Sequence, residues 1–189
     1  MVDSIRSVAN VGETDAYRAS PQFAVSLRKL AVMSLCTFGL YELYWCYKQW
    51  DTLRRREGEI LSPFWRAFFA PLWGFSLFPR IQELTAKHGV PATWPAGGLA
   101  LAFLLLTAAW RLPDPWSLIS FGSFLPLLLV QRSLNALNAA VVPTAERNDR
   151  YSGWNVVIIV IGAILLVFAV WAAVSPNSGD VRTTRDVAA

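Results

Sequence analysis

Residues 154–174 read WNVVIIVIGAILLVFAVWAAV and decide the fold class of this chain. The stretch has 21 residues and no charged side chain. At roughly 1.5 Å per helical residue its length is about 31 Å, the thickness of the hydrocarbon core of a bilayer. Trp154 and Trp171 stand near its two ends, where aromatic side chains commonly anchor a helix at the membrane interfaces. The stretch therefore predicts a transmembrane helix.

The composition of the whole chain agrees with a membrane location. Hydrophobic residues make up 54% of the 189 residues and charged residues only 16%, against roughly 25% charged residues in soluble proteins. Nine Trp and eleven Phe and a mean hydropathy of +0.38 argue against disorder and against a soluble nucleic-acid-binding domain. The net charge is +4, and its positive residues stand at the ends of apolar runs. This placement favours a membrane surface over nucleic acid as the partner.

Two further apolar runs predict a helical hairpin. Residues 95–110 read PAGGLALAFLLLTAAW, and residues 116–130 read WSLISFGSFLPLLLV. Only RLPDP separates them, and its two prolines would end one helix and begin the next. The second helix is expected to continue without a breaker to Pro143. Small residues that would let another helix approach closely are Gly98 and Ala102 in this hairpin and Gly162, Ala169 and Ala173 in the 154–174 run.

The N-terminal apolar runs are less regular. Residues 30–47 are long enough to cross a bilayer, but Glu42 lies within them and Gly39 is a candidate break. Residues 62–79 contain three prolines, Arg66 and seven aromatic rings, which suits an interfacial or re-entrant element better than a straight span. We therefore expect an aromatic-rich, membrane-embedded N-terminal module.

The expected fold class is an all-α polytopic integral membrane protein with three to five membrane helices. Residues 1–22 and 175–189 are expected to form flexible tails around one membrane domain, 23–174. Lys and Arg favour the cytoplasmic side of a membrane. Five or four spans would divide these residues almost evenly between the two sides. If 30–47 and 62–79 together return to their starting side, 14 of the 17 Lys and Arg residues share one side. That three-span arrangement follows the rule best, with a cytoplasmic N-terminal tail and a periplasmic C-terminal tail.

Several polar side chains within or beside the apolar runs are candidate functional residues. A charge at a helix centre in the bilayer costs about 2.5–3.5 kcal/mol, which singles out Glu42 and Arg66. They could pair with each other, Glu42 could titrate in proton-coupled transport, or both could reach water near an interface. Two further sets were identified by spacing: the one-face stripe Gln131, Asn135 and Asn138, and the basic cluster Lys48, Arg54, Arg55 and Arg56.

The stripe and the cluster each have a structural and a functional interpretation. Gln131, Asn135 and Asn138 are expected to bond neighbouring helices or lipid headgroups, with a solute pathway as the alternative. The basic cluster could contact anionic headgroups or simply keep its loop on the cytoplasmic side. The nearby acidic residues Asp51, Glu57 and Glu59 weaken specific lipid binding.

The sequence offers no catalytic, cofactor-binding or metal-ligating motif. Cys36 and Cys46 would lie about 15 Å apart along one helix, beyond disulfide reach, and are interpreted as small buried hydrophobic residues. His88 is the only histidine and has no sequence sign of a nucleophilic partner. We therefore predict no catalytic residues, no cofactor and no metal.

The aromatic segment after residue 36 resembles a known group of bacterial membrane proteins, domain of unknown function 4234. Its pattern, T-x-G-x-Y-x-x-Y-W-x-Y-K-x-W, falls on Thr37, Gly39, Tyr41, Tyr44, Trp45, Tyr47, Lys48 and Trp50, and a Pro-Phe-x-Arg element falls on Pro63, Phe64 and Arg66. The later stretch VQRSLNALNAAVVPTAERNDRYSGWN also resembles longer members, so the similarity covers about residues 27–170. It implies a multi-pass protein of the bacterial inner membrane and supplies no activity.

Three functions remain open from the sequence. The first is a non-catalytic membrane component that binds membrane lipids, anionic ones included, or another membrane protein or a second copy of itself. The second is a small oligomeric transporter or channel that uses Glu42, Arg66 and the stripe. The third, an enzyme acting on lipids, has the least support because no acid–base pair is evident.

Overall fold

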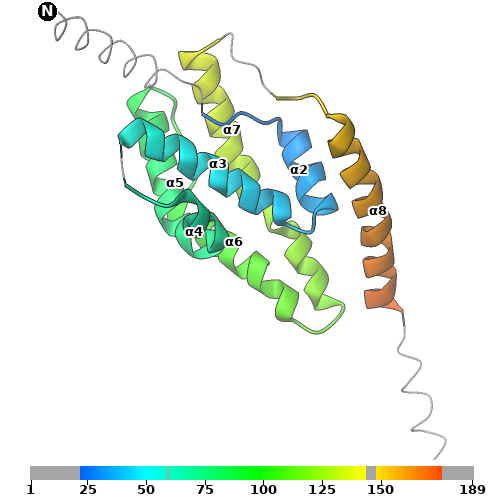
Figure 1. The fold of residues 1–189 in the computed structure, drawn as a ribbon. Helices are drawn as coiled ribbons and strands as arrows, with labels where there is room; N and C mark the ends of the chain where they lie inside the picture. The colour runs from blue at the N-terminus through cyan, green and yellow to red at the C-terminus, as the bar shows by residue number, and fades with distance from the viewer. Residues whose placement is uncertain (1–21, 59, 144–147, 176–189) are drawn as a thin grey trace, which may run out of the picture.

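The computed structural model describes residues 22–58, 60–143 and 148–175, and this part of the chain contains helices and no strand. The all-helical prediction is therefore confirmed (Figure 1). Both predicted tails lie outside the described residues except for Gln22 and Ser175. The elements in chain order are α2 (Leu27–Cys36), α3 (Leu40–Glu57), α4 (Pro63–Phe68), α5 (Ala70–Lys87), α6 (Ala96–Ala108), η1 (Ala109–Arg111), η2 (Trp116–Gly122), α7 (Phe124–Val141) and α8 (Gly153–Val174).

Within the described residues, two helices are long and apolar enough to cross a membrane. One is Trp116–Val141, formed by the 3₁₀ helix η2 and α7, and the other is α8. A third apolar helix, Ala96–Arg111, is shorter and combines α6 with η1. By length and composition the first two support a membrane location.

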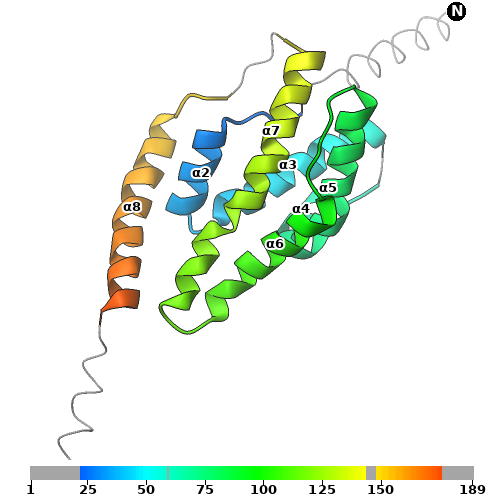
Figure 2. The same ribbon diagram turned by 180° about the vertical axis from the view of Figure 1, so that it is seen from behind.

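The predicted hairpin is present. The helix α6 and η1 runs antiparallel to η2 and α7, and the turn between them lies at the end of the molecule where α8 also ends (Figures 1 and 2). The helix α7 continues to Val141, two residues before Pro143, as the sequence predicts. The sequence did not reveal that residues 116–122 wind as a 3₁₀ helix.

The 30–47 run is two helices rather than one. The helix α2 ends at Cys36, and α3 begins at Leu40 after a sharp turn. Phe38 and Gly39 both have left-handed backbone conformations, with φ of 52° and 85°, which glycine adopts without steric penalty. The Thr37 hydroxyl bonds both sides of the turn, since it donates to the Met33 carbonyl (2.7 Å) and accepts from the Tyr41 amide (2.9 Å). Gly39 therefore breaks the run, and the chain turns back.

The 62–79 run is also broken, as its prolines and charge predict. The short helix α4 begins with Pro63 in its first turn and ends before Phe69, where α5 starts. The helix α5 then continues through Pro79 to Lys87, eight residues beyond the run seen in the sequence. The long polar part of α5 lies towards the same end of the molecule as the last turns of α3 (Figure 1).

The core lies where α3, α5, α6 and α7 meet. Its largest fully buried side chains are Trp45 and Trp50 from α3, Phe78 from α5 and Phe103 from α6. Gly74 of α5 faces Ala100 of α6, and a Cβ added at Gly74 would stand 3.7 Å from the Ala100 Cβ, an ordinary van der Waals distance. The sequence had assigned the close contact on this helix to Gly98 and Ala102. Gly98 is instead exposed, and its space is limited only by Pro95 of its own chain segment.

The helix α8 stands at the edge of the bundle and packs mainly on α2 (Figures 1 and 2). Gly162 is its one buried residue and touches the backbone of Cys36 so closely that a Cβ would overlap it. This confirms the predicted close approach at Gly162. At the other end of α2, the Lys29 ammonium donates to the Asn148 side chain (2.9 Å) and the Arg150 carbonyl (2.7 Å). Burial lowers the pKa of Lys29, an effect that nearby Asp149 opposes.

Candidate functional site

A cavity of about 710 Å³ lies between the hairpin, the α2–α3 turn and the C-terminal half of α8. Glu42 and Leu43 from α3 and Phe38 from the turn line one side. The opposite walls come from η2, from the end of α6 and from the small residues Ala169, Ala172 and Ala173 of α8. Two of the three small residues that the sequence singled out in α8, Ala169 and Ala173, therefore face a space and not another helix.

Glu42 is the buried carboxylate of this cavity. It lies in the first turn of α3, three residues after the left-handed Gly39, and is only 4% exposed. The Ser123 hydroxyl donates a 2.8 Å hydrogen bond to one carboxylate oxygen. A carboxylate in the first turn is also stabilised by the positive end of the helix dipole. The turn at Gly39 is thus what places a carboxyl group inside the molecule.

A row of hydroxyl groups runs from Glu42 towards the hairpin turn. Ser117, Ser120 and Ser123 are three residues apart on a 3₁₀ segment, where residues at this spacing share one face. All three line the cavity, as does Asp114 at the turn. The Ser117 hydroxyl donates to the Asp114 carboxylate, and the Ser120 hydroxyl donates to the Ser117 carbonyl (2.7 Å). The row thus lies between the buried carboxylate of Glu42 and the exposed carboxylate of Asp114.

Two further hydroxyl groups of the lining have no hydrogen-bond partner. The Oγ of Ser34 on α2 and the Oγ1 of Thr107 on α6 are both buried and unpaired. Ser34 as a whole is 2% exposed. Buried polar atoms are nearly always satisfied in folded proteins, and these two are among the exceptions in the described part of the chain. Sequence reasoning missed both, because no spacing relates them to Glu42.

The predicted amide stripe holds a segment of the chain and does not line the cavity. Asn138 exchanges two hydrogen bonds with the backbone of Gln22, of 2.8 and 2.9 Å, and Asn135 donates to the Val25 carbonyl (3.0 Å). Gln131 is fully buried; its carbonyl oxygen accepts from the Trp45 indole (2.6 Å), and its amide group donates to the Asn135 side chain (2.8 Å).

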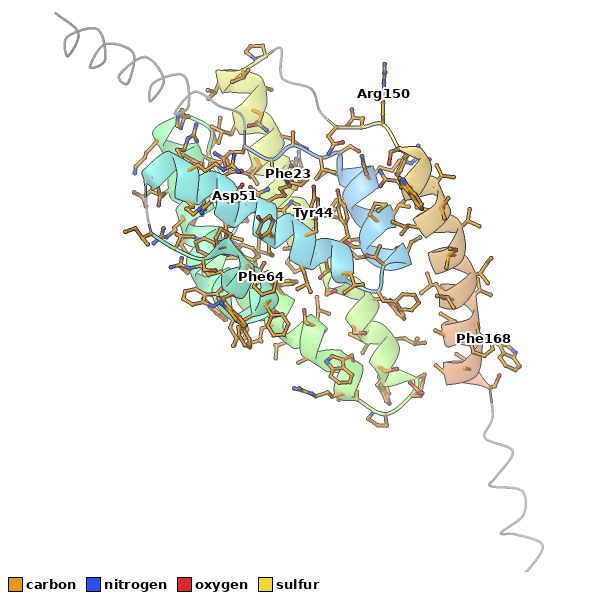
Figure 3. The ribbon with its side chains drawn as sticks, viewed as in Figure 1. Phe23, Tyr44, Asp51, Phe64, Arg150 and Phe168 are labelled. Atoms are coloured by element: carbon orange, nitrogen blue, oxygen red, sulfur yellow. The ribbon has the colours of Figure 1, made fainter. Side chains whose placement is uncertain are left out.

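The stripe thus pins residues 22–26, which run extended before α2, onto α7. Gln22 was assigned to the flexible tail, but it is 2% exposed and bonded to Asn138. Gln22 is therefore packed against α7 together with the rest of this segment. Phe23 of this segment packs edge-on against Tyr44 of α3 (Figure 3).

Arg66 lies between two tryptophan rings, away from Glu42. Its guanidinium group is 4.4 Å from the centre of the Trp50 ring and 4.5 Å from that of Trp73. Such cation–π contacts stabilise a desolvated guanidinium group. Among the described residues, Arg66 forms no ion pair with Glu42, whose hydrogen-bond partner is Ser123. Arg66 therefore joins α3 to α5 and is absent from the cavity lining.

Asp51 forms ion pairs with two residues of the basic cluster. Both Arg54 and Arg55 contact the Asp51 carboxylate at 2.8 Å, within α3. The Lys48 ammonium lies 5.6 Å from the centre of the Tyr44 ring on the same helix; Figure 3 shows Tyr44 and Asp51 on α3. Arg56 is half-buried near the end of α3. Asp51 thus neutralises part of the charge that the sequence offered to lipid headgroups.

His88 and the two cysteines lie outside the cavity lining. His88 is exposed at the end of α5, where its ring nitrogen lies 2.9 Å from the Leu84 carbonyl oxygen. Cys36 and Cys46 are both free thiols, half-buried and buried respectively. Glu42 and His88, whose convergence would have supported an enzyme acting on lipids, do not meet.

Comparisons with known proteins do not place this chain in a family. No family model, curated protein or solved structure matches this chain. The resemblance of Thr37–Trp50 to the bacterial membrane group named above stays a prediction.

Proposed function

We propose that this chain is a polytopic protein of the bacterial inner membrane that acts as a non-catalytic component, binding lipids or another membrane protein. The observation that carries the proposal is the exposure of α8. This helix has the highest hydropathy of the described part, yet almost all of its side chains are exposed. Ile164, Val167 and Phe168 are 63–71% exposed. An apolar surface of this extent requires a bilayer or a protein partner.

Three crossing segments fit the chain path best: Ala96–Arg111, Trp116–Val141 and Gly153–Val174. The α2–α3 and α4–α5 pairs would then enter the membrane and return to the same side, for which the turn at Phe38 and Gly39 is the supporting feature. This arrangement gives the 14-to-3 division of Lys and Arg. It puts the N-terminal tail in the cytoplasm and the C-terminal tail in the periplasm.

Cysteine labelling tests the topology. In a variant lacking Cys36 and Cys46, single cysteines replace Pro113 in the hairpin turn or Pro143 after α7, both exposed positions. A membrane-impermeant maleimide added to intact spheroplasts should label the Pro113→Cys protein, and should label the Pro143→Cys protein only after lysis. Labelling of both before lysis, or extraction of the wild-type protein by buffer without detergent, would refute the topology.

Purification in mild detergent followed by mass spectrometry of bound lipids and proteins tests the function. A stoichiometric protein partner or one selected lipid class should co-purify. Replacing Ile164 and Val167 on α8 by Ala should weaken that association, because the exposed face of α8 is the surface proposed to hold the partner. The matched control is Leu101 and Leu105 on α6, also exposed, replaced by Ala in the same way. A chain that retains neither lipid nor protein would contradict the proposal.

A small transporter is the second candidate, and the cavity beside Glu42 is what favours it. The cavity combines a buried carboxylate with a volume that accommodates a small organic molecule. Arg66 and the amide stripe, which the sequence had joined to Glu42 in this role, line no part of it. A transporter would therefore depend on Glu42 and the hydroxyl row alone.

A further inference from the structure

We propose that the cavity beside Glu42 binds a lipophilic organic cation, a protonated amine attached to a compact apolar group. The inference deepens the proposed function by giving the membrane component a ligand of stated chemistry. It rests on the charge of the lining, the rings and small residues of its walls, and the serine hydroxyl groups beside Glu42.

The charge of the lining is negative only. Among the described residues that line the cavity, Glu42 and Asp114 are the charged ones, and neither Lys, Arg nor His contributes. Glu42 is buried and bonded to Ser123 through one carboxylate oxygen, which leaves its other oxygen for a ligand. A cation near a buried carboxylate offsets the unfavourable burial of that charge. An anion would meet repulsion from both carboxylates.

The walls fit an apolar body. The aromatic rings of Phe38, Phe68, Phe103, Trp110 and Phe121 line the cavity. Their faces attract cations as well as apolar groups. On the α8 side, the three alanines present little side-chain bulk, so that wall leaves room for a rigid apolar group.

The hydroxyl groups of the lining favour an amine over a quaternary ammonium. The side chains of Ser117, Ser120 and Ser123 line the cavity, and Ser123 is bonded to Glu42. A hydroxyl oxygen accepts hydrogen bonds, and a protonated primary amine carries three N–H donors. One ammonium group could therefore use the Glu42 carboxylate together with a serine hydroxyl of this row.

An ammonium group could also come from a phospholipid headgroup such as phosphatidylethanolamine. A phosphate would accompany it, and phosphate is bound in proteins by Arg, Lys or backbone amides. Because no basic side chain lines the described cavity, the structure favours an amine without a phosphate.

Three molecules with the same rigid cage test the proposal: 1-aminoadamantane, 1-adamantanol and adamantane-1-carboxylate. The full chain is reconstituted in phosphatidylcholine nanodiscs, and binding of each radiolabelled compound is measured at pH 7 with empty nanodiscs subtracted. We expect saturable binding of the amine to one site per chain, with the alcohol and the carboxylate at least about tenfold weaker. Equal binding of all three compounds, or no binding of the amine, would overturn the proposal.

Variants locate the site. Glu42→Gln keeps the size of the side chain and should weaken amine binding at least about tenfold, whereas Glu42→Asp should retain most of it. The matched control is Glu83→Gln, at an exposed position outside the cavity, which should bind like the wild type. Unchanged amine binding in Glu42→Gln would refute the assignment of the amine site to the cavity beside Glu42. If that variant fails to fold, the selectivity of the wild-type protein among the three compounds still tests the proposal.

Nanodiscs made with phosphatidylethanolamine distinguish the two sources of the ammonium group. Unchanged amine binding in them supports a free amine, and its loss would assign the site to the lipid headgroup and overturn the phosphate-free ligand. The labelling of Pro113→Cys and Pro143→Cys tests the membrane topology separately. A correctly inserted protein that does not bind the amine would therefore refute this inference and leave the proposed topology standing.

Discussion

Replacing Gly162 by Ala should detach α8 from α2. A Cβ built on Gly162 overlaps the carbonyl oxygen of Cys36 and lies 2.6 Å from its carbonyl carbon and 2.8 Å from its Cα. Ordinary van der Waals contact begins at 3.4 Å. The two helices would therefore have to separate by more than 0.8 Å at this point (3.4 − 2.6 Å for the carbonyl carbon), since the carbonyl oxygen lies closer still. Both partners are backbone, and neither can rotate away.

The free energy of this change follows from how α8 is held. Its main contact is with α2, and helices within a bilayer associate through close packing at small residues. Overpacking a tight contact costs about 1–3 kcal/mol. The helix has few other contacts to compensate, so we expect the upper part of this range and a lower apparent melting temperature.

The assay compares Gly162→Ala with Gly97→Ala in the same detergent. Gly97 lies in the first turn of α6, and a Cβ there would meet nothing within 4 Å, so its replacement should be neutral or slightly stabilising. Thermal unfolding is followed by tryptophan fluorescence. In Gly162→Ala the half-buried Cys36 thiol should also react faster with maleimide, because α8 no longer covers it.

Equal melting temperatures for Gly162→Ala and Gly97→Ala, together with unchanged Cys36 reactivity, would show that α8 is not seated on α2 as described. Faster Cys36 labelling without a change in melting temperature would mean that the contact exists and contributes little to stability. That outcome would refute the energetic part of the reasoning.

Three other substitutions probe the remaining polar contacts. Asn138→Leu removes both hydrogen bonds to Gln22 and leaves the backbone groups of Gln22 unpaired, which should lower the free energy of unfolding by about 1–3 kcal/mol. Amide hydrogen exchange should accelerate in residues 22–26 and stay unchanged in α8. Arg66→Lys keeps the charge but loses the planar stacking, so unfolding stability should fall by about 0.5–2 kcal/mol, measured by chemical denaturation; a value equal to wild type would contradict the stacking. Asp51→Asn removes the carboxylate that contacts Arg54 and Arg55 and makes the cluster more positive. It should therefore increase co-purified anionic lipid, measured by native mass spectrometry. An unchanged lipid profile would show that the cluster does not contact headgroups.

The sequence predicts a structural element best where the residues of that one segment determine it. The helix α8 follows from its uncharged length, and the hairpin follows from two apolar runs with prolines between them. The break in the first run was foreseen at Gly39, since a left-handed turn favours glycine. On α6 the sequence singles out Gly98 as a contact residue, but the structure leaves Gly98 exposed, and the buried Ala100 faces Gly74 of α5 instead.

At the candidate site, too, the sequence indicates features of single segments and misses contacts between distant ones. Glu42 stands out in the sequence as a charge in an apolar run, but its partner Ser123 is 81 residues away and meets it only because the chain turns back at Gly39. The spacing of Ser117 from the other two serines carries meaning only on a 3₁₀ helix, which the apolar pattern did not indicate. The sequence predicts the amide stripe as one face of a helix, whereas Gln22, which bonds Asn138, is predicted to lie in the N-terminal tail.

The pairing of Gln22 with Asn138 has a consequence for biosynthesis. These residues are 116 positions apart, so Gln22 cannot dock on Asn138 until the ribosome has translated almost all of α7. Before that point the backbone groups of Gln22 lack the partner that they have in the folded protein. The contact that holds residues 22–26 on α7 therefore forms late in synthesis, after α2 to α6 have been translated.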